Sequence, residues 1–326
     1  MKVVVLGGSG FVGTRFVAQL LGEGHDVVIG DSKPSAIFPD LSREVDVCDE
    51  KALVSLFEGA DVVVNLAAAH RDDIRPVSIY FDVNVGGARS VCRAATAAEV
   101  SSIVFTSSVA IYGTTAENEI CTEDREPRPF NDYGRSKLEA EGVYREWLKG
   151  DSGRRLTIIR PTVIFGEDNR GNVYNLMRQV AAGKFVMIGK GENRKSVAYV
   201  ENISAFLCRC LETNERYMVL NYVDGPDLSV ARLVALIKET LGRTASRGLS
   251  IPYWFGWLAG GLLDVVAGIT GRTFPISRVR VMKFCANTRF SAAAAMEAGF
   301  TPPVEIEDAI QRTVRHEFMA DPNGES

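Results

Sequence analysis

The chain has 326 residues, of which 46% are hydrophobic and 24% charged, and its formal net charge is -4. This length permits a full hydrophobic core, in one large domain or two coupled ones. The mild acidity, without any block of Lys and Arg, argues against a nucleic-acid-binding surface. Six cysteines and three histidines lack metal-site spacing, which favours reduced thiols in a cytoplasmic protein and no metal site. Strand-like residues begin at Lys2, so no signal peptide is expected.

In chain order, apolar strand patterns alternate with helical patterns over the first half of the chain. Strands are predicted at residues 2–7, 26–31, 61–68, 102–108 and 156–166, and helices at 11–24, 50–59, 78–99 and 133–149. This alternation predicts parallel strands joined by right-handed crossovers. The strands are almost wholly apolar, as is typical when helices cover both faces of a sheet. The predicted class is therefore α/β, a doubly wound parallel sheet of the Rossmann type.

After Gly166 the alternation becomes irregular. We predict a dinucleotide-binding domain at residues 1–166 and a smaller mixed substrate-binding region at 167–326, interleaved with returns to the sheet. One apolar segment at 251–271 approaches the length of a membrane span, but Asp264 and five glycines weaken that interpretation. The segment favours a buried or subunit-facing helix, with contact to a membrane surface as the alternative.

A glycine-rich turn follows the first predicted strand. Gly7, Gly10 and Gly13 lie at three-residue spacing before an apolar helix, and Gly8, Gly10 and Gly13 also fit G-x-G-x-x-G. Such glycines permit a tight turn and a close backbone approach to a pyrophosphate, which the helix N-terminus attracts. Asp31 ends the second strand, where an acid binds the adenosine ribose. Its charge repels a 2'-phosphate and favours NAD over NADP, although Lys33 nearby softens this preference.

Three hydroxyl residues, Thr106, Ser107 and Ser108, end the apolar strand that begins near residue 102. The carboxyl end of a parallel strand opens onto the crevice where ligands bind, and hydroxyls are useful there. Ser108 is the predicted holder of a substrate oxygen. Ser107 could take that part instead, or could satisfy backbone groups.

Tyr133 and Lys137 lie four residues apart on a predicted helix and so share one face. A free phenol titrates near 10, and lowering its pKa to about 7 takes about 4 kcal/mol. One ammonium about 4 Å away supplies about that much at an effective dielectric constant of about 20. Tyr133 could then take a proton from a sugar hydroxyl as hydride leaves the carbon.

Together these residues resemble the extended short-chain dehydrogenase/reductase family, in its nucleotide-sugar epimerase and dehydratase branch, over nearly the whole chain. The motifs that carry the resemblance are LGGSGFVG at 6–13, DVCD at 46–49, NLAA at 65–68, DVNVGGAR at 82–89, SSVAIYG at 107–113, YGRSK at 133–137 and RPTVIFG at 160–166. The resemblance implies Ser108, Tyr133 and Lys137 as catalytic residues. It implies cofactor contacts from Gly7, Gly10, Phe11, Val12, Gly13, Asp31, Asp46, Val47, Leu66, Ala67, Ala68, Asn84, Tyr133, Lys137 and Arg160.

In the second half, the resemblance implies a substrate site. Besides Ser107 and Ser108, its predicted residues are Asn175, Arg194, Lys195 and Arg280, with Arg278 as an alternative to Arg280. Basic side chains there would offset the charge of a diphosphate. The implied partners are a nucleotide-sugar substrate and a second copy of the chain in a homodimer.

One departure from the family pattern bears on the reaction. Sugar dehydratases of this family carry an Asp-Glu pair just after the catalytic hydroxyl, where this chain has Val109 and Ala110. The sequence therefore favours a nucleotide-sugar 4-epimerase or 4-keto-reductase over a dehydratase. The alternatives are a hydroxysteroid-type dehydrogenase/isomerase and a cofactor-binding regulator without catalysis.

Overall fold

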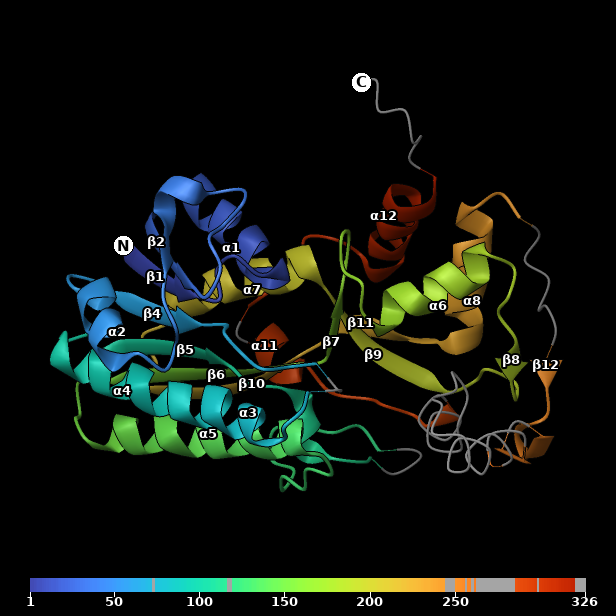
Figure 1. Cartoon of the computed structure of the whole chain (residues 1–326). Coiled ribbons are helices and arrows are strands. Elements are labelled where there is room, and N and C mark those ends of the chain that lie inside the picture. Colours follow the sequence, from blue (N-terminus) through green and yellow to red (C-terminus); the bar gives the residue numbers. More distant parts are fainter. Residues whose placement is uncertain are drawn as a thin grey trace.

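The structure is a computed structural model with two adjoining regions (Figure 1). It describes residues 1–71, 74–115, 119–243, 250–255, 257–258, 261, 285–297 and 299–319. Among these residues, no helix combines the length and apolar character needed to cross a bilayer.

The first region is built on a seven-stranded sheet with the strand order β10-β6-β5-β4-β1-β2-β3. Every neighbouring pair in it is parallel. Its strands are β1 (Lys2–Leu6), β2 (Asp26–Asp31), β3 (Ser42–Glu44), β4 (Val62–Asn65), β5 (Ser102–Thr106), β6 (Arg155–Pro161) and β10 (Tyr217–Tyr222). The predicted α/β class with a doubly wound parallel sheet is confirmed.

Helices cover both faces of this sheet (Figure 1). In β1, Val3 and Val5 join the core beneath α1 (Phe11–Gly22) and α7 (Val200–Leu211), whereas Val4 and Leu6 join the opposite core. The opposite core is formed with α2 (Glu50–Phe57), α4 (Gly87–Ala97) and α5 (Asp132–Lys149). Successive side chains of a strand point to opposite faces, so a strand buried on both faces must be apolar throughout.

Two predicted elements divide in the structure. The helix predicted at 78–99 consists of α3 (Ser78–Phe81), a π-helical turn η2 (Asp82–Gly86) and α4. The strand predicted at 156–166 divides after Pro161, and its second part, β7 (Val163–Phe165), joins another sheet. The short 3-10 turns η1 (Pro39–Leu41) and η3 (Val109–Tyr112) complete this region.

The second region holds a three-stranded sheet, β11-β9-β7, and a two-stranded sheet, β12-β8. Its elements are α6 (Asn172–Ala181), β8 (Met187–Ile188), β9 (Arg194–Tyr199), β11 (Asp224–Ser229), α8 (Val230–Thr240), β12 (Ser250–Ile251) and α12 (Ile306–Phe318). Helices α6, α8 and α12 share one apolar core with the three-stranded sheet. Among the described elements, three from the second half of the chain belong to the first region: β10, α7 and α11 (Ala293–Glu297), which packs on β10. The predicted boundary at residue 166 stays a prediction.

Candidate active site

The glycine turn between β1 and α1 is shaped for close approach of a ligand. Gly7 has a φ of +76°, and a side chain there would lie 2.7 Å from the Ala67 nitrogen. A Cβ at Gly13 would lie 2.3 Å from the Gly7 carbonyl oxygen, so this turn requires glycine. α1 begins at Phe11 with Gly10 as its N-cap and no side-chain cap, which leaves its first amides to attract an anion.

The turn also holds a buried hydroxyl without a hydrogen-bond partner among the described residues, Ser9 Oγ. Thr106 Oγ1 at the end of β5 shares this property, whereas the Ser107 hydroxyl faces the Glu141 carboxylate and helps to lower its pKa. Buried polar atoms are normally paired, so the hydroxyls of Ser9 and Thr106 fit a crevice that receives a polar ligand. The glycine turn and these hydroxyls suit the pyrophosphate and riboses of a dinucleotide.

The predicted adenosine side of the crevice is partly held by protein contacts. Asp31 accepts a hydrogen bond from the Ser9 amide at 3.1 Å, so it also fixes the glycine turn. Asp46 is exposed and accepts from the Cys48 amide at 2.8 Å. Val47 packs against the start of α4, where a Cβ at Gly87 would lie 2.9 Å from its side chain. These contacts order the strand ends at which the ribose hydroxyls and the adenine are expected.

The structure brings the segments of the three predicted catalytic residues together. Ser108 follows β5, and its Oγ caps η3 by accepting from the Ala110 amide at 3.1 Å. Tyr133 lies in the first turn of α5, and a Cβ at the next residue, Gly134, would lie 2.5 Å from the Ala110 carbonyl oxygen. Lys137 lies one turn further on, with its Nζ 4.4 Å from the ring centroid of Phe105 in β5. α5 therefore packs directly against the strand end that carries the serines.

Lys137 is buried, with only 2% of its surface exposed. Burial lowers the pKa of its amine to about 7, and the nearby Glu141 carboxylate opposes this effect. The lysine therefore titrates near neutral pH. Desolvation therefore disfavours the full ammonium charge that would lower the pKa of Tyr133.

Asn84 lies in the π-helical turn η2 and joins two parts of the site. Its Oδ1 accepts from the Ala69 amide at 2.9 Å, and its Nδ2 donates to Ser136 Oγ at 2.8 Å and to the Ala69 carbonyl at 3.1 Å. Ser136 in turn donates to the Tyr133 carbonyl at 2.8 Å. The Asn84 amide thus positions α5 against the chain after β4, and its predicted cofactor contact stays a prediction. π-Helical turns often occur at functional sites for such local reasons.

Arg160 has a structural place that the sequence did not predict. Its guanidinium donates to both carboxylate oxygens of Glu141, at 2.9 and 2.8 Å, and to Tyr112 Oη at 2.6 Å. Arg160 is 3% exposed and Glu141 is fully buried. Glu141 supplies the counter-ion that this buried charge needs, and the predicted cofactor contact of Arg160 stays a prediction. The sequence does place Glu141 on the same helix face as Lys137, because the two residues are four positions apart.

A cavity of about 510 Å³ lies on the substrate side. It is lined by Thr115, Ile188, Gly189, Lys190, Gly191, Glu192, Asn193, Tyr253, Cys285, Ala286 and Asn287. Thr115 follows the serine motif by a few residues and donates to the Asn287 carbonyl at 3.1 Å. The cavity thus adjoins the loop that leads from Ser108.

Two of the predicted basic residues, Arg194 and Lys195, contact residues that line this cavity. The Arg194 amide donates to Asn287 Oδ1 at 2.7 Å, and Lys195 Nζ donates to the Ala286 carbonyl at 2.5 Å. Burial lowers the pKa of Lys195 to about 8, so it carries charge at neutral pH. Lys190 lines the cavity itself and was missed, because a lone lysine in a glycine-rich loop carries no local signal. Asn175 is placed on α6, and Arg280 lies outside the described residues.

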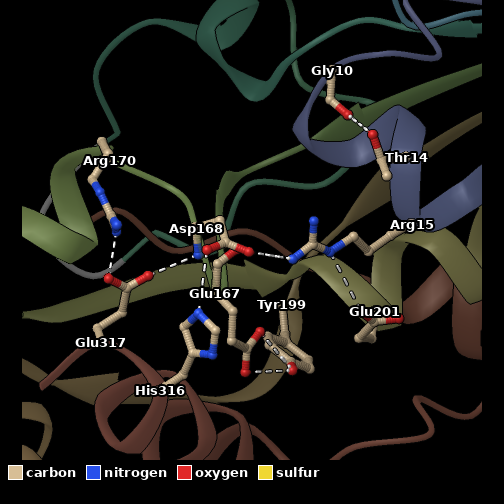
Figure 2. Close-up of polar contacts among 10 residues, drawn as sticks. All are labelled: Gly10, Thr14, Arg15, Glu167, Asp168, Arg170, Tyr199, Glu201, His316 and Glu317. Atoms are coloured by element: carbon tan, nitrogen blue, oxygen red, sulfur yellow. Dashed lines mark hydrogen bonds and ion pairs between the residues drawn. The ribbon is translucent and has the colours of Figure 1, made fainter. Parts of the chain in front are cut away.

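An ion-pair cluster beside the glycine turn connects the two regions (Figure 2). Arg15 of α1 bonds to Asp168 at 3.1 Å, and His316 of α12 lies 3.2 Å from the same carboxylate. Arg170 pairs with Glu317 of α12. Asp168, His316 and Glu317 are close enough to share a metal ion, but arginines already pair with both carboxylates. The cluster therefore links α1 to α12 through the loop that carries Asp168 and Arg170.

Comparison with known proteins agrees with this geometry. The family model described as the NAD dependent epimerase/dehydratase family matches residues 3–221. The chain is 45% identical, over 98% of its length and 96% of the relative's, to an N-acetyl-alpha-D-glucosaminyl-diphospho-ditrans,octacis-undecaprenol 4-epimerase of Escherichia coli O157:H7. It is 30% identical to a UDP-glucose 4-epimerase of Vibrio cholerae over 83% of this chain and 85% of that one.

A solved structure shares the fold. UDP-glucuronic acid 4-epimerase from Bacillus cereus, in complex with NAD, superposes with a TM-score of 0.76 at 18% identity, covering 97% of this chain and 98% of that one. The fold, the glycine turn and the family match agree. The chain therefore belongs to the NAD-dependent epimerase/dehydratase family and is an enzyme of the extended short-chain dehydrogenase/reductase type.

Proposed function

We propose that the chain inverts the configuration at C4 of an N-acetylglucosaminyl group linked to a polyprenyl diphosphate. The observation that carries this proposal is the 45% identity, over almost the full length of both chains, to a 4-epimerase whose name states that substrate. Val109 and Ala110 follow Ser108 and can move no proton, which supports epimerisation over elimination of water.

In the proposed mechanism, NAD supplies a reversible acceptor for the C4 hydride. The glycine turn would hold the pyrophosphate of this cofactor, Asp31 its adenosine ribose, and Lys137 its nicotinamide ribose. Tyr133 takes the proton of the C4 hydroxyl as hydride leaves, and returns it after the keto sugar has turned over. Ser108 Oγ already accepts from the Ala110 amide, so its own hydrogen can be donated to the sugar oxygen.

The diphosphate is proposed to lie against the cavity of about 510 Å³, near Lys190, Arg194 and Lys195. Cations there would offset its charges. A second candidate substrate is UDP-N-acetylglucosamine, because the chain also resembles UDP-glucose 4-epimerases at 30% identity. The lipid-linked substrate takes precedence because its relative is more similar and covers more of the chain. We further propose a cytoplasmic homodimer as the working form.

The test compares Tyr133→Phe with Tyr217→Phe. Tyr217 is a 41%-exposed tyrosine of β10 that serves as the matched control. Each protein is incubated with N-acetylglucosaminyl-diphospho-polyprenol and with UDP-N-acetylglucosamine, and the released sugar is identified by chromatography. Loss of one proton-transfer group is expected to slow turnover by about 100-fold or more in the first variant only. Unchanged turnover by Tyr133→Phe would refute the proposed role, and inactivity of the wild type on both substrates would refute the proposed reaction.

A further inference from the structure

β8 and β12 lie together at one end of the second region (Figure 1). A group of exposed apolar side chains follows β12 in the chain. We call it the aromatic patch; its residues and exposed fractions are Tyr253 44%, Trp254 62%, Phe255 50%, Trp257 40% and Leu258 51%. Single exposed apolar residues are common, but a group of this size usually marks a contact surface. The sequence favoured a buried or subunit-facing helix for this segment, and the described residues of the patch are not buried within the chain. The rest of 251–271 lies largely outside the described residues.

The aromatic patch is joined to the substrate cavity. β12 pairs in parallel with β8, and the Gly189 amide donates to the Ile251 carbonyl at 2.9 Å. Tyr253 belongs to the patch and also lines the cavity. The patch therefore begins at the wall of the cavity proposed to receive the diphosphate. A lipid chain attached to that diphosphate would leave the cavity beside apolar side chains.

The surroundings of the patch carry positive charge. Lys184 and Lys190 flank β8 and are exposed, and Val186 between them is 37% exposed. Glu192 is the acidic residue of the same loop. Trp and Tyr rings near lysines are the combination that binds the interfacial layer of a bilayer with anionic lipids.

We propose that the aromatic patch rests on the surface of an anionic phospholipid bilayer and guides the polyprenyl chain of the substrate to the cavity. The part concerning the polyprenyl chain rests on the proposed function. Trp254 and Phe255 enter the headgroup layer, Lys184 and Lys190 attract anionic headgroups, and the diphosphate reaches the cavity past Tyr253. A nucleotide-sugar enzyme would need no such surface, because its substrate dissolves in water.

The test uses the full chain as purified and vesicles of phosphatidylglycerol and phosphatidylethanolamine. The variant carries Trp254→Ser with Phe255→Ser, and the control carries Leu21→Ser with Ile37→Ser, two apolar residues exposed by 36% and 64% on the first region. Wild type and control are expected to sediment with vesicles. The patch variant is expected to bind at least about tenfold more weakly, and added salt to weaken wild-type binding.

Activity separates this inference from the proposed function. The patch variant is expected to keep wild-type turnover of a short-chain, water-soluble diphosphosugar and to lose it on long-chain substrate in vesicles. If the wild type turns over the short substrate but does not bind vesicles, the proposed membrane contact of the aromatic patch is refuted and the proposed function stands. Vesicle binding with no epimerisation of either substrate would support the surface and overturn the proposed function. A shift of the patch variant to a smaller oligomer, without a change in vesicle binding, would identify a subunit interface and overturn the proposal.

Discussion

The change Glu141→Gln tests whether the buried ion pair beneath the active site is held by mutual charge. Glu141 lies on α5, the helix of Tyr133 and Lys137, and its carboxylate meets Arg160 through two hydrogen bonds at 2.9 and 2.8 Å. Burial alone would raise the pKa of Glu141. The hydrogen bonds and charge of Arg160 outweigh that effect, and the pKa of Glu141 is lowered.

The amide of glutamine keeps the shape of the side chain but removes its charge. Arg160 would then stay buried, with its side chain 4% exposed, beside the neutral hydroxyl of Tyr112. Breaking a buried pair by removing one partner costs about 3–5 kcal/mol of unfolding free energy. The matched control is Glu146→Gln on the same helix, because Glu146 pairs with Lys149 at 2.7 Å and both side chains are at least 70% exposed. That exposed pair is expected to contribute less than about 1 kcal/mol.

The measurement is urea unfolding followed by circular dichroism at pH 7.5. Because the folded-state pKa of Glu141 lies below its unfolded value, its contribution is complete above the unfolded pKa and is lost as the pH falls through the folded value. The difference between wild type and Glu141→Gln should therefore shrink at acidic pH. Should the variant not fold, Glu141→Leu with Arg160→Met should recover folding, since it removes both buried charges; Arg145, the other partner of Glu141, has a 32%-exposed side chain that water can solvate. Equal losses from Glu141→Gln and Glu146→Gln would refute the reasoning.

Three further changes test the cofactor side. Gly13→Ala places a methyl group 2.3 Å from the Gly7 carbonyl oxygen, which forces the glycine turn out of shape. The purified variant should therefore release no NAD on denaturation, and a full equivalent of released NAD would contradict this prediction. In the wild type, the unfolding free energy should rise between pH 7 and 10.5, because in that range the unfolded Lys137 binds a proton that the folded one has lost. Lys137→Met should abolish this rise, measured by urea unfolding at pH 7 and 9.5. The same rise in the variant would show that burial of Lys137 is not its cause. Asp31→Ser should raise NADPH affinity relative to NADH by about tenfold, measured by fluorescence titration, whereas an unchanged ratio would exclude charge repulsion as the cause.

The sequence alone determined the class of fold and the chemistry of its motifs, because both depend on neighbours along the chain. The alternation of apolar strands with helical periods indicated a parallel sheet, which the order of the seven strands confirms. The spacing of Gly7, Gly10 and Gly13 indicated a turn without side chains, and the structure shows the close contacts that require it. Tyr133 and Lys137 share a helix face at any tertiary arrangement, since their spacing is one helical turn.

Tertiary structure decided every feature that joins distant segments. Arg160 and Glu141 meet across a strand and a helix, and no local pattern showed that the arginine would be used inside the protein. The cavity proposed to receive the diphosphate unites residues near 115, 190, 253 and 286, whose closeness depends on chain crossovers. Burial, opposed by the Glu141 carboxylate, lowers the pKa of Lys137 to about 7, and desolvation is a property of the surroundings that a sequence spacing does not contain.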